Sequence, residues 1–149
     1  MTLPHFLLKE DIKIMSRTAI YTANTAAQNV AVNGVISPGT IVRRFGQGLT
    51  LSGNAVQVSC PGYYDFDASI TLAPTAIGNV TVTLYKDGVP VQGATATESV
   101  DTANNPVNLS LNCLIREKCG YCEGLSNLTL VLTGTAASVT NVAIVTEKI

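Results

Sequence analysis

The chain has 149 residues, of which nine are basic and ten acidic, and only 13% are charged, against about 25% in a typical soluble domain. This length suits one domain, and the near-balance of charge excludes nucleic-acid binding driven by a basic surplus. An apolar content of 46% argues against disorder, and no apolar run reaches the roughly 18–20 residues of a membrane-spanning helix.

Residues 1–17 differ in composition from the rest of the chain, because apolar and charged residues mix there without a regular period. The segment lacks the apolar core and the small-residue cleavage site of a secretion signal. Two interpretations remain open: an arm, helical or extended, that docks on another molecule, or a partly ordered terminus with the domain starting at Met15. If it is an arm, its larger apolar side chains are the expected anchors: Leu3, Phe6, Leu7 and Ile12.

After Ser16, threonine and valine dominate, and apolar and polar residues alternate with period 2. Each alternation predicts a strand with one buried and one solvated face, as in an antiparallel sheet. The expected inward positions are Val30 and Val32; Val56, Val58 and Cys60; Tyr64, Phe66, Ala68, Ile70 and Leu72; Val80, Val82 and Leu84; Val107, Leu109, Leu111 and Cys113; and Leu128, Leu130 and Leu132.

Turn residues separate these stretches. The Asp87-Gly88 pair between two alternating segments predicts a β-hairpin. Further turns are expected at residues 37–39, 61–62, 104–106 and 133–134. Short strands at this spacing, with no helical period between them, predict an all-β protein: an antiparallel β-sandwich of the jelly-roll type.

The last predicted strand, residues 139–146, differs from the others because it is apolar on both parities. Val139, Ala143 and Val145 fall on one parity, and Val142 and Ile144 on the other. In a one-domain sandwich, a strand covered on both sides needs a second subunit on its outer side. Together with the low charge, this strand predicts an oligomer.

Residues of the types that carry catalysis are scarce. The single histidine is His5, in the N-terminal segment, and no common nucleotide-binding, hydrolase or metalloprotease motif occurs. Asp65 and Asp67 could form a paired-carboxylate site, but they are more simply explained as polar positions of one strand. The sequence therefore predicts a protein that is not an enzyme and has no cofactor.

The stretch Ser59–Phe66 resembles a strand of C1q/TNF-like trimeric jelly rolls, in which a glycine and aromatic residues open a central strand as Gly-x-Tyr-x-Phe. "LSGNAVQV" precedes it, the hairpin "VTVTLYKDGVPV" follows it, and the chain ends on "VTNVAIVTEKI", like the family's final strand. The resemblance covers residues 18–149. Without a collagen stalk or a secretion signal, the chain is most similar to phage virion and bacterial spore-surface versions of the fold.

The resemblance implies a homotrimer whose inner sheet holds residues 62–72, 106–115 and 139–146, with Asp65 and Asp67 facing the threefold axis. Like charges are costly to bury, so these carboxylates need an arginine of a neighbouring copy, a cation such as Ca²⁺, or water. The alternative is that they point into solvent. The expected trimer-interface residues are Arg43, Arg44, Tyr63, Asp65, Asp67, Val142 and Ile144.

Four cysteines leave three alternatives open. Cys113, Cys119 and Cys122 form a Cys-x5-Cys-x2-Cys pattern that could bind zinc, with Cys60 as a fourth ligand. In the topology that the resemblance implies, Cys60 and Cys113 lie on antiparallel neighbours, so a 60–113 disulfide is conceivable, as is a 119–122 disulfide. Reduced core thiols are the third alternative, since disulfides are rare in the cytoplasm.

These observations lead to a functional hypothesis: a virion structural protein, in the form of a trimeric capsid decoration or head-fibre knob. Residues 1–17 would anchor it to a capsid or other shell protein, and residues 18–149 would form the jelly roll. It would be made in the cytoplasm of a bacterial host, without secretion, and displayed on the virion surface, with no nucleic-acid or membrane partner. The alternative is a C1q/TNF-like module of a spore coat or tail fibre that binds a receptor or a surface glycan.

Overall fold

The structure, a computed structural model, describes residues 17–118 and 125–149. Nearly all of the expected arm, with its anchors Leu3, Phe6, Leu7 and Ile12, lies outside the described residues, as do Cys119 and Cys122. In the described ranges every regular element is a β-strand. That part of the chain accordingly contains no helix long and apolar enough to cross a membrane.

The described residues form twelve strands, many of them with the period-2 burial that the sequence predicts. They are β1 (Ala19–Asn24), β2 (Gln28–Val30), β3 (Val35–Ile36), β4 (Thr40–Phe45), β5 (Leu49–Ser52), β6 (Ala55–Val58), β7 (Gly62–Pro74), β8 (Gly78–Lys86), β9 (Val89–Val100), β10 (Val107–Glu117), β11 (Ser126–Thr133) and β12 (Ala137–Lys148).

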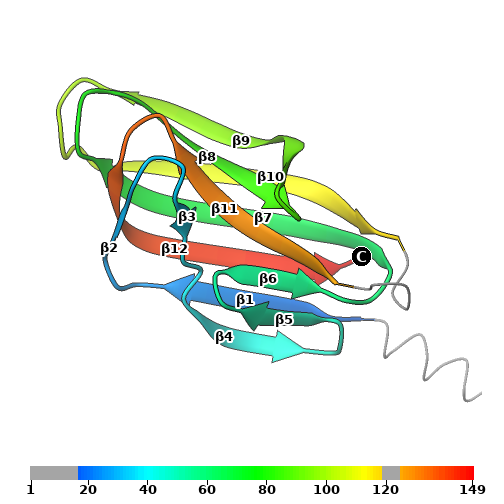
Figure 1. Cartoon of the computed structure of the whole chain (residues 1–149). Coiled ribbons are helices and arrows are strands. Elements are labelled where there is room, and N and C mark those ends of the chain that lie inside the picture. Colours follow the sequence, from blue (N-terminus) through cyan, green and yellow to red (C-terminus); the bar gives the residue numbers. More distant parts are fainter. Residues whose placement is uncertain (1–16, 119–124) are drawn as a thin grey trace, which may run out of the picture.

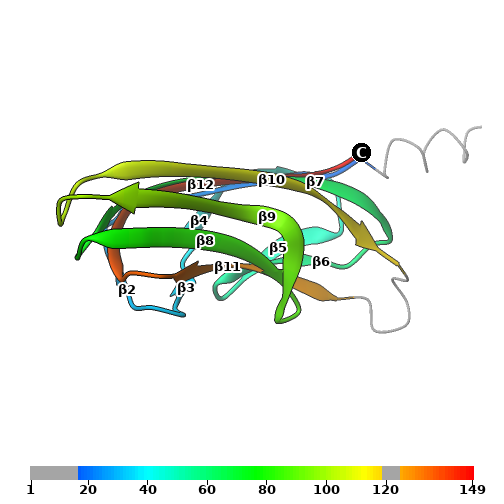
Figure 2. The ribbon, with the colours of Figure 1, turned by 90° about the horizontal axis from the view of Figure 1, so that it is seen from above.

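The strands build two antiparallel sheets that face each other (Figures 1 and 2). Sheet A has the order β10-β7-β12-β1-β4, with β2 also paired to β12. Sheet B has the order β5-β6-β11-β8-β9, with β3 also paired to β11. The start of β1 and the end of β12 lie at one end of the sandwich, where the amide of Lys148 donates a hydrogen bond to the carbonyl of Thr18 at 2.9 Å (Figure 1). This arrangement confirms the predicted sandwich.

The core lies between the two sheets and consists largely of the predicted inward positions. Along β7, Tyr64, Phe66 and Ile70 are at most 1% exposed. The predictions fail where a strand ends early: the chain turns at Asn33, which has φ 69°, so Val32 lies outside β2 and is 45% exposed.

The predicted hairpin is confirmed. Lys86 pairs with Val89, and between them Asp87 and Gly88 have φ angles of 53° and 82°. Two consecutive positive φ angles characterise the tight turn that matches the twist of paired strands. The Asp87 side chain also accepts a hydrogen bond from the amide of Asn127 at 2.8 Å, which ties the turn to β11.

The two-sided apolar character of the last strand has a partly different cause from the one expected. The pairing of β12 with β7 shifts between Val139 and Asn141, so one extra residue is accommodated in β12. This bulge turns both Val139 and Val142 inward, each 0% exposed, and Ile144 is 3% exposed. The expectation that Val142 and Ile144 form a subunit interface is therefore wrong, because both side chains are already covered by sheet B.

The structure does not contain the disulfide between Cys60 and Cys113, which was one of the open alternatives. Cys113 lies opposite Phe66, and the pairing of β10 with β7 continues from there to Glu117 opposite Gly62, about 14 Å further at 3.4 Å per residue. Cys60 precedes Gly62 by two residues and lies outside this pairing. Both cysteines are free thiols.

Candidate functional site on the outer face of sheet A

The outer face of sheet A is the side turned away from sheet B, and its residues are ordered in rows by the strand register. Each row runs from β4 across β1, β12 and β7 to β10, and neighbouring rows are about 7 Å apart. The Arg43 row is Arg43, Tyr21, Val145, Asp67 and Asn112. The Phe45 row is Phe45, Ala19, Glu147, Asp65 and Leu114. The Ala23 row is Thr40, Ala23, Ala143, Ser69 and Ser110.

Large apolar side chains are exposed on this face. They are Tyr21, Phe45, Tyr63, Leu114 and Val145, with exposed fractions from 37% to 58%. The outer face of sheet B is different, because β8 and β9 present threonines that pair with each other, Thr81 with Thr97 at 2.8 Å and Thr83 with Thr95 at 3.0 Å. Exposed apolar surface of this kind marks interaction sites, so the outer face of sheet A is the candidate functional site.

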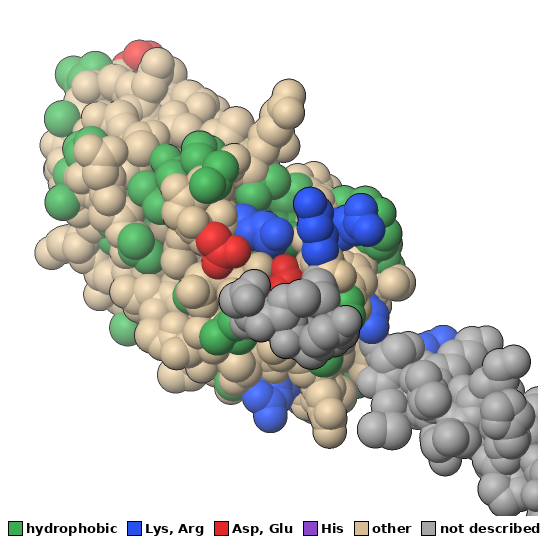
Figure 3. Space-filling model, turned by 45° about the vertical axis from the view of Figure 1, so that its right-hand side comes forward, with side chains coloured by type: hydrophobic (Ala, Val, Ile, Leu, Met, Phe, Trp, Pro, Cys, Tyr) green, Lys and Arg blue, Asp and Glu red, His purple; other side chains and the backbone are tan. Residues whose placement is uncertain are grey.

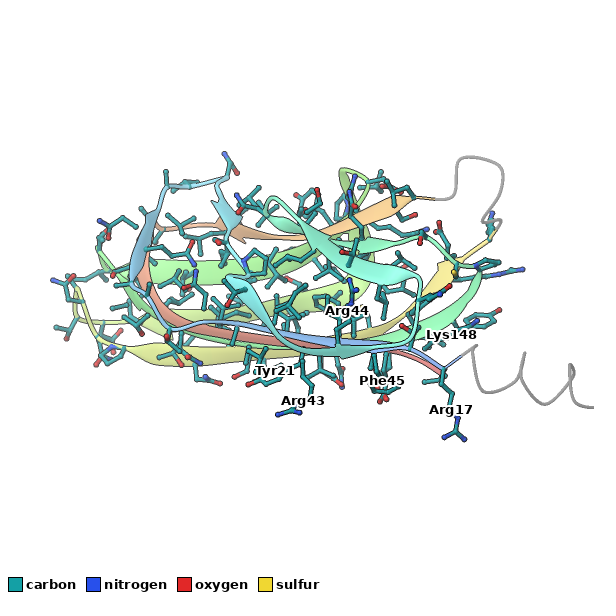
Figure 4. The ribbon with its side chains drawn as sticks, turned by 90° about the horizontal axis from the view of Figure 1, so that it is seen from below. Arg17, Tyr21, Arg43, Arg44, Phe45 and Lys148 are labelled. Atoms are coloured by element: carbon teal, nitrogen blue, oxygen red, sulfur yellow. The ribbon has the colours of Figure 1, made fainter. Side chains whose placement is uncertain are left out.

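Two hollows interrupt the face where side chains are small. The larger, of about 420 Å³, lies over β10, β7 and β12 beside Ser69, Ser110 and Ala143 of the Ala23 row, with Asp67 at its side. The smaller, of about 110 Å³, lies above Ala19 and is bounded by Tyr21, Arg43, Phe45 and Val145. Figure 4 shows Tyr21, Arg43 and Phe45 projecting from the sheet away from the sandwich.

Charge on the face is divided by strand. The acidic residues lie on the two central strands: Asp65 and Asp67 on β7, and Glu147 on β12 opposite Asp65. Two basic residues lie on the edge strands, Arg43 on β4 and Arg116 on β10, where the guanidinium of Arg116 stands 5.7 Å from the ring centre of Tyr63. A third, Arg17, precedes β1 and projects from the same side (Figure 4). Among the described residues no cation lies within 4.0 Å of these carboxylates.

The pKa of Asp67 reflects this crowding. Partial burial and the charge of Asp65 raise the pKa of the Asp67 carboxyl above its ordinary value, and a hydrogen bond from Asn112 opposes the change. Burial and the same two carboxylates also raise the pKa of the Cys113 thiol, on the inner side of β10, to about 11. The negative charge of the central strands would therefore favour a cation supplied from outside the chain.

Four of the seven residues expected at an interface meet on this face: Arg43, Tyr63, Asp65 and Asp67. Arg44 does not, because it points to the other side of β4 and its guanidinium donates a hydrogen bond to Thr50 Oγ1 at 3.3 Å (Figure 4). Val142 and Ile144 belong to the core. The zinc hypothesis for Cys113, Cys119 and Cys122 stays a prediction, because two of the three lie outside the described residues.

Sequence reasoning missed several residues of the face, chiefly Tyr21, Phe45, Leu114 and Glu147. A signal was present for Leu114, which is apolar on the parity that its strand otherwise gives to Asn108, Ser110 and Asn112. An apolar residue on a solvated parity indicates a surface that something else covers. Phe45 gave no such signal, because every residue of β4 is exposed.

A second cluster lies at the end of the sandwich where β10 ends and β11 begins. Glu117 is 7% exposed, and its Oε1 accepts a hydrogen bond from Ser126 Oγ at 2.6 Å and lies 3.8 Å from Lys86 Nζ. Burial, Cys60 and Glu117 raise the pKa of Tyr64 to about 12, and its hydroxyl donates to the Cys60 carbonyl at 2.7 Å. Most charged side chains in view gather at this end (Figure 3).

No protein-family model and no curated protein sequence matches the chain. Solved structures do match it, and each of the three described next covers 89% of the chain. Murine APRIL matches with a TM-score of 0.68 at 12% identity, over 99% of its own chain. The globular domain of zebrafish complement 1qA matches with a TM-score of 0.65 at 9% identity, over 96% of its own chain. The PRD1 vertex protein P5 matches with a TM-score of 0.55 at 16% identity, also over 96% of its own chain.

The chain has the TNF/C1q-like jelly-roll fold. This confirms the resemblance carried by Gly62, Tyr64 and Phe66, and the predicted fold class. At identities this low the likeness establishes the fold of residues 17–118 and 125–149, and function has to be argued from the surface.

Proposed function

We propose that this protein is a virion structural protein, a homotrimeric jelly-roll knob that decorates a capsid or forms a head fibre. The observation that carries the proposal is the outer face of sheet A, where Tyr21, Phe45 and Leu114 are exposed beside carboxylates that have no ion-pair partner among residues 17–118 and 125–149. A subunit interface would bury these side chains. The shared fold with a phage protein, the PRD1 vertex protein P5, supports placement in a virion.

In this proposal residues 1–17 anchor the knob and residues 18–149 form it. β1 begins at Ala19, directly after the anchoring segment, and leaves from the end of the sandwich where β12 ends. The opposite end, with the turn between β7 and β8, would point away from the shell. Leu3, Phe6, Leu7 and Ile12 would contact the capsid or shell protein.

The oligomeric state is the first test. Light scattering of the full chain coupled to gel filtration should give a mass close to three times 15.6 kDa. A monomer at micromolar concentration would contradict the trimer.

The virion role needs its own test, because a trimer alone fits several functions. Antibodies against the purified chain should label the surface of the virus particles whose genome encodes it. A variant lacking residues 1–16 should remain a folded trimer and should no longer sediment with shells assembled without the protein. Loss of the trimer in this variant would make the segment part of the fold, and retained sedimentation would reject it as the anchor.

The receptor- or glycan-binding alternative predicts an exposed aromatic platform on the trimer. The exposed rings of Tyr21, Phe45 and Tyr63 lie on the face that the trimer would cover. On the outer face of sheet B, Tyr85 is half-buried. A glycan array probed with the trimer separates the two functions, and specific binding would favour the alternative.

A further inference from the structure

The outer face of sheet A consists of two unlike halves that complement each other. The β4–β1 half carries Arg43 and the small apolar hollow above Ala19. The β7–β10 half carries Asp67 and the exposed side chain of Leu114. We propose that copies of the chain associate head to tail, with the β7–β10 half of one copy docked on the β4–β1 half of the next. This inference rests on the proposed homotrimer and specifies its contacts.

Symmetry requires two unlike patches. A closed ring of three copies uses a heterologous contact, in which one patch meets a different patch on the neighbour. The strands of sheet A run along the length of the sandwich (Figures 1 and 2). Rotation about a threefold axis parallel to the strands does not change the position of a row along that axis. Residues of one row therefore meet residues of the same row in the neighbouring copy.

The Phe45 row supplies the apolar contact. Leu114 is at its β10 end and is 57% exposed, and Ala19 is near its β4 end, under the hollow of about 110 Å³. Leu114 of one copy therefore docks into the hollow above Ala19 of the next copy. Because Ala19 has only a methyl group, the hollow exists within one copy and is filled by the neighbour.

The Arg43 row supplies the charged contact. Arg43 stands at the β4 edge, and Asp67 lies one strand in from the β10 edge. When the β4 edge of one copy docks on the β10 edge of the next, the guanidinium of Arg43 reaches past Asn112 of the neighbour to the carboxylate of Asp67. Asp67 has no cation within 4.0 Å among the described residues of its own copy, and arginine pairs well with a partly buried carboxylate.

Other partners for the carboxylates fit less well. Arg44 points to the opposite side of β4, toward Thr50. Arg116 stands over the ring of Tyr63 in its own copy. The described part of one chain holds no group of three metal-ligating side chains. Arg17 projects from the same side just before β1 (Figure 4), outside the two rows, so Arg43 of a neighbouring copy is the cation that shares a row with Asp67.

Charge reversal tests the ionic contact. Arg43→Asp and Asp67→Arg should each raise the trimer–monomer dissociation constant about tenfold or more, measured by sedimentation velocity, because each places like charges together. The double variant should restore the dissociation constant to within a few-fold of the original. Arg44→Asp is the matched control, one residue along the same exposed strand, and should leave the trimer intact.

Leu114→Asp tests the apolar contact and should also weaken the trimer, whereas Ile77→Asp should not, although Ile77 is 69% exposed in the turn between β7 and β8. Circular dichroism of every variant must show an intact β-sandwich. If the unmodified chain is a monomer, the proposed trimer fails. If it is a trimer and the single reversals leave it intact, or the double variant is not rescued, the head-to-tail contact is wrong while the trimer stands.

Discussion

At the scale of single residues, the buried carboxylate of Glu117 depends on few partners. Ser126→Ala removes the hydroxyl that donates to Glu117 Oε1 at 2.6 Å. Hydrogen bonds to charged groups contribute about 1.5–3 kcal/mol, so we expect a loss of this size in the free energy of unfolding. Urea denaturation at one fixed protein concentration measures it, since an oligomer's stability depends on concentration.

Ser52→Ala is the matched control for this substitution, because Ser52 ends β5 with an exposed side chain. We expect its effect to stay within about 0.5 kcal/mol. Equal losses in the two variants would show that the hydroxyl of Ser126 contributes nothing specific to the buried carboxylate.

The thiol of Cys113 offers a second residue-scale prediction. With its pKa at about 11, this thiol is almost fully protonated at neutral pH. We expect iodoacetamide at about pH 8 to alkylate Cys113 roughly two orders of magnitude more slowly in the folded chain than in urea, because only the thiolate reacts. Mass spectrometry of the peptide that contains Cys113 gives both rates. Equal rates would contradict the raised pKa.

At the scale of elements, glycine turns fix where strands end. Gly88 and Gly134 both have positive φ, 82° and 88°. An added Cβ at Gly88 meets nothing within 4 Å, whereas at Gly134 it would collide with the carbonyl oxygen of Asn79. We therefore expect Gly88→Ala to cost about 1–2 kcal/mol and Gly134→Ala distinctly more. Thermal unfolding followed by circular dichroism compares them, and a larger loss in Gly88→Ala would contradict this account.

The alternation of apolar and polar residues allowed most of the strands to be predicted from the sequence. Period-2 patterns found the inward residues of β7, β8 and β11, because burial on one face leaves a direct trace in residue type. The bulge in β12 left no such trace. A strand can carry apolar residues on both parities for two reasons: both of its faces are covered, or an extra residue reverses the parity midway. Only the register of β12 with β7 distinguishes these two cases.

The candidate site was harder to predict for the same reason. Arg43 and Asp67 share a row only because β4, β1, β12 and β7 pair in one particular register, and the residues are far apart in the sequence. The sequence did indicate carboxylates on an outward face, and the resemblance left a neighbour's arginine, a cation, water or plain solvent exposure open for them. It could not choose between Arg43 and Arg44, because that choice depends on which side of β4 faces the core.

At the scale of the whole molecule, the head-to-tail contact makes the trimer sensitive to acid. In the separate chain, burial and the charge of Asp65 raise the pKa of Asp67. Docking of Arg43 from the next copy favours the charged carboxylate and lowers that pKa. Since the pKa is lower in the trimer, the linked stability is present above the separate chain's pKa and is lost as the pH falls through the trimer's pKa.

We therefore expect the dissociation constant to rise at least tenfold between about pH 7 and about pH 4, the range in which carboxyl groups titrate. Asp65 on the same strand and Glu147 on β12 face the same region, and Asn112 on β10 adds no charge to it. Asp67→Asn separates their contributions: it should weaken the trimer at neutral pH and flatten the dependence on pH. If the variant and the original respond to acid equally, Asp67 does not carry the response and the pairing of Arg43 with Asp67 is rejected.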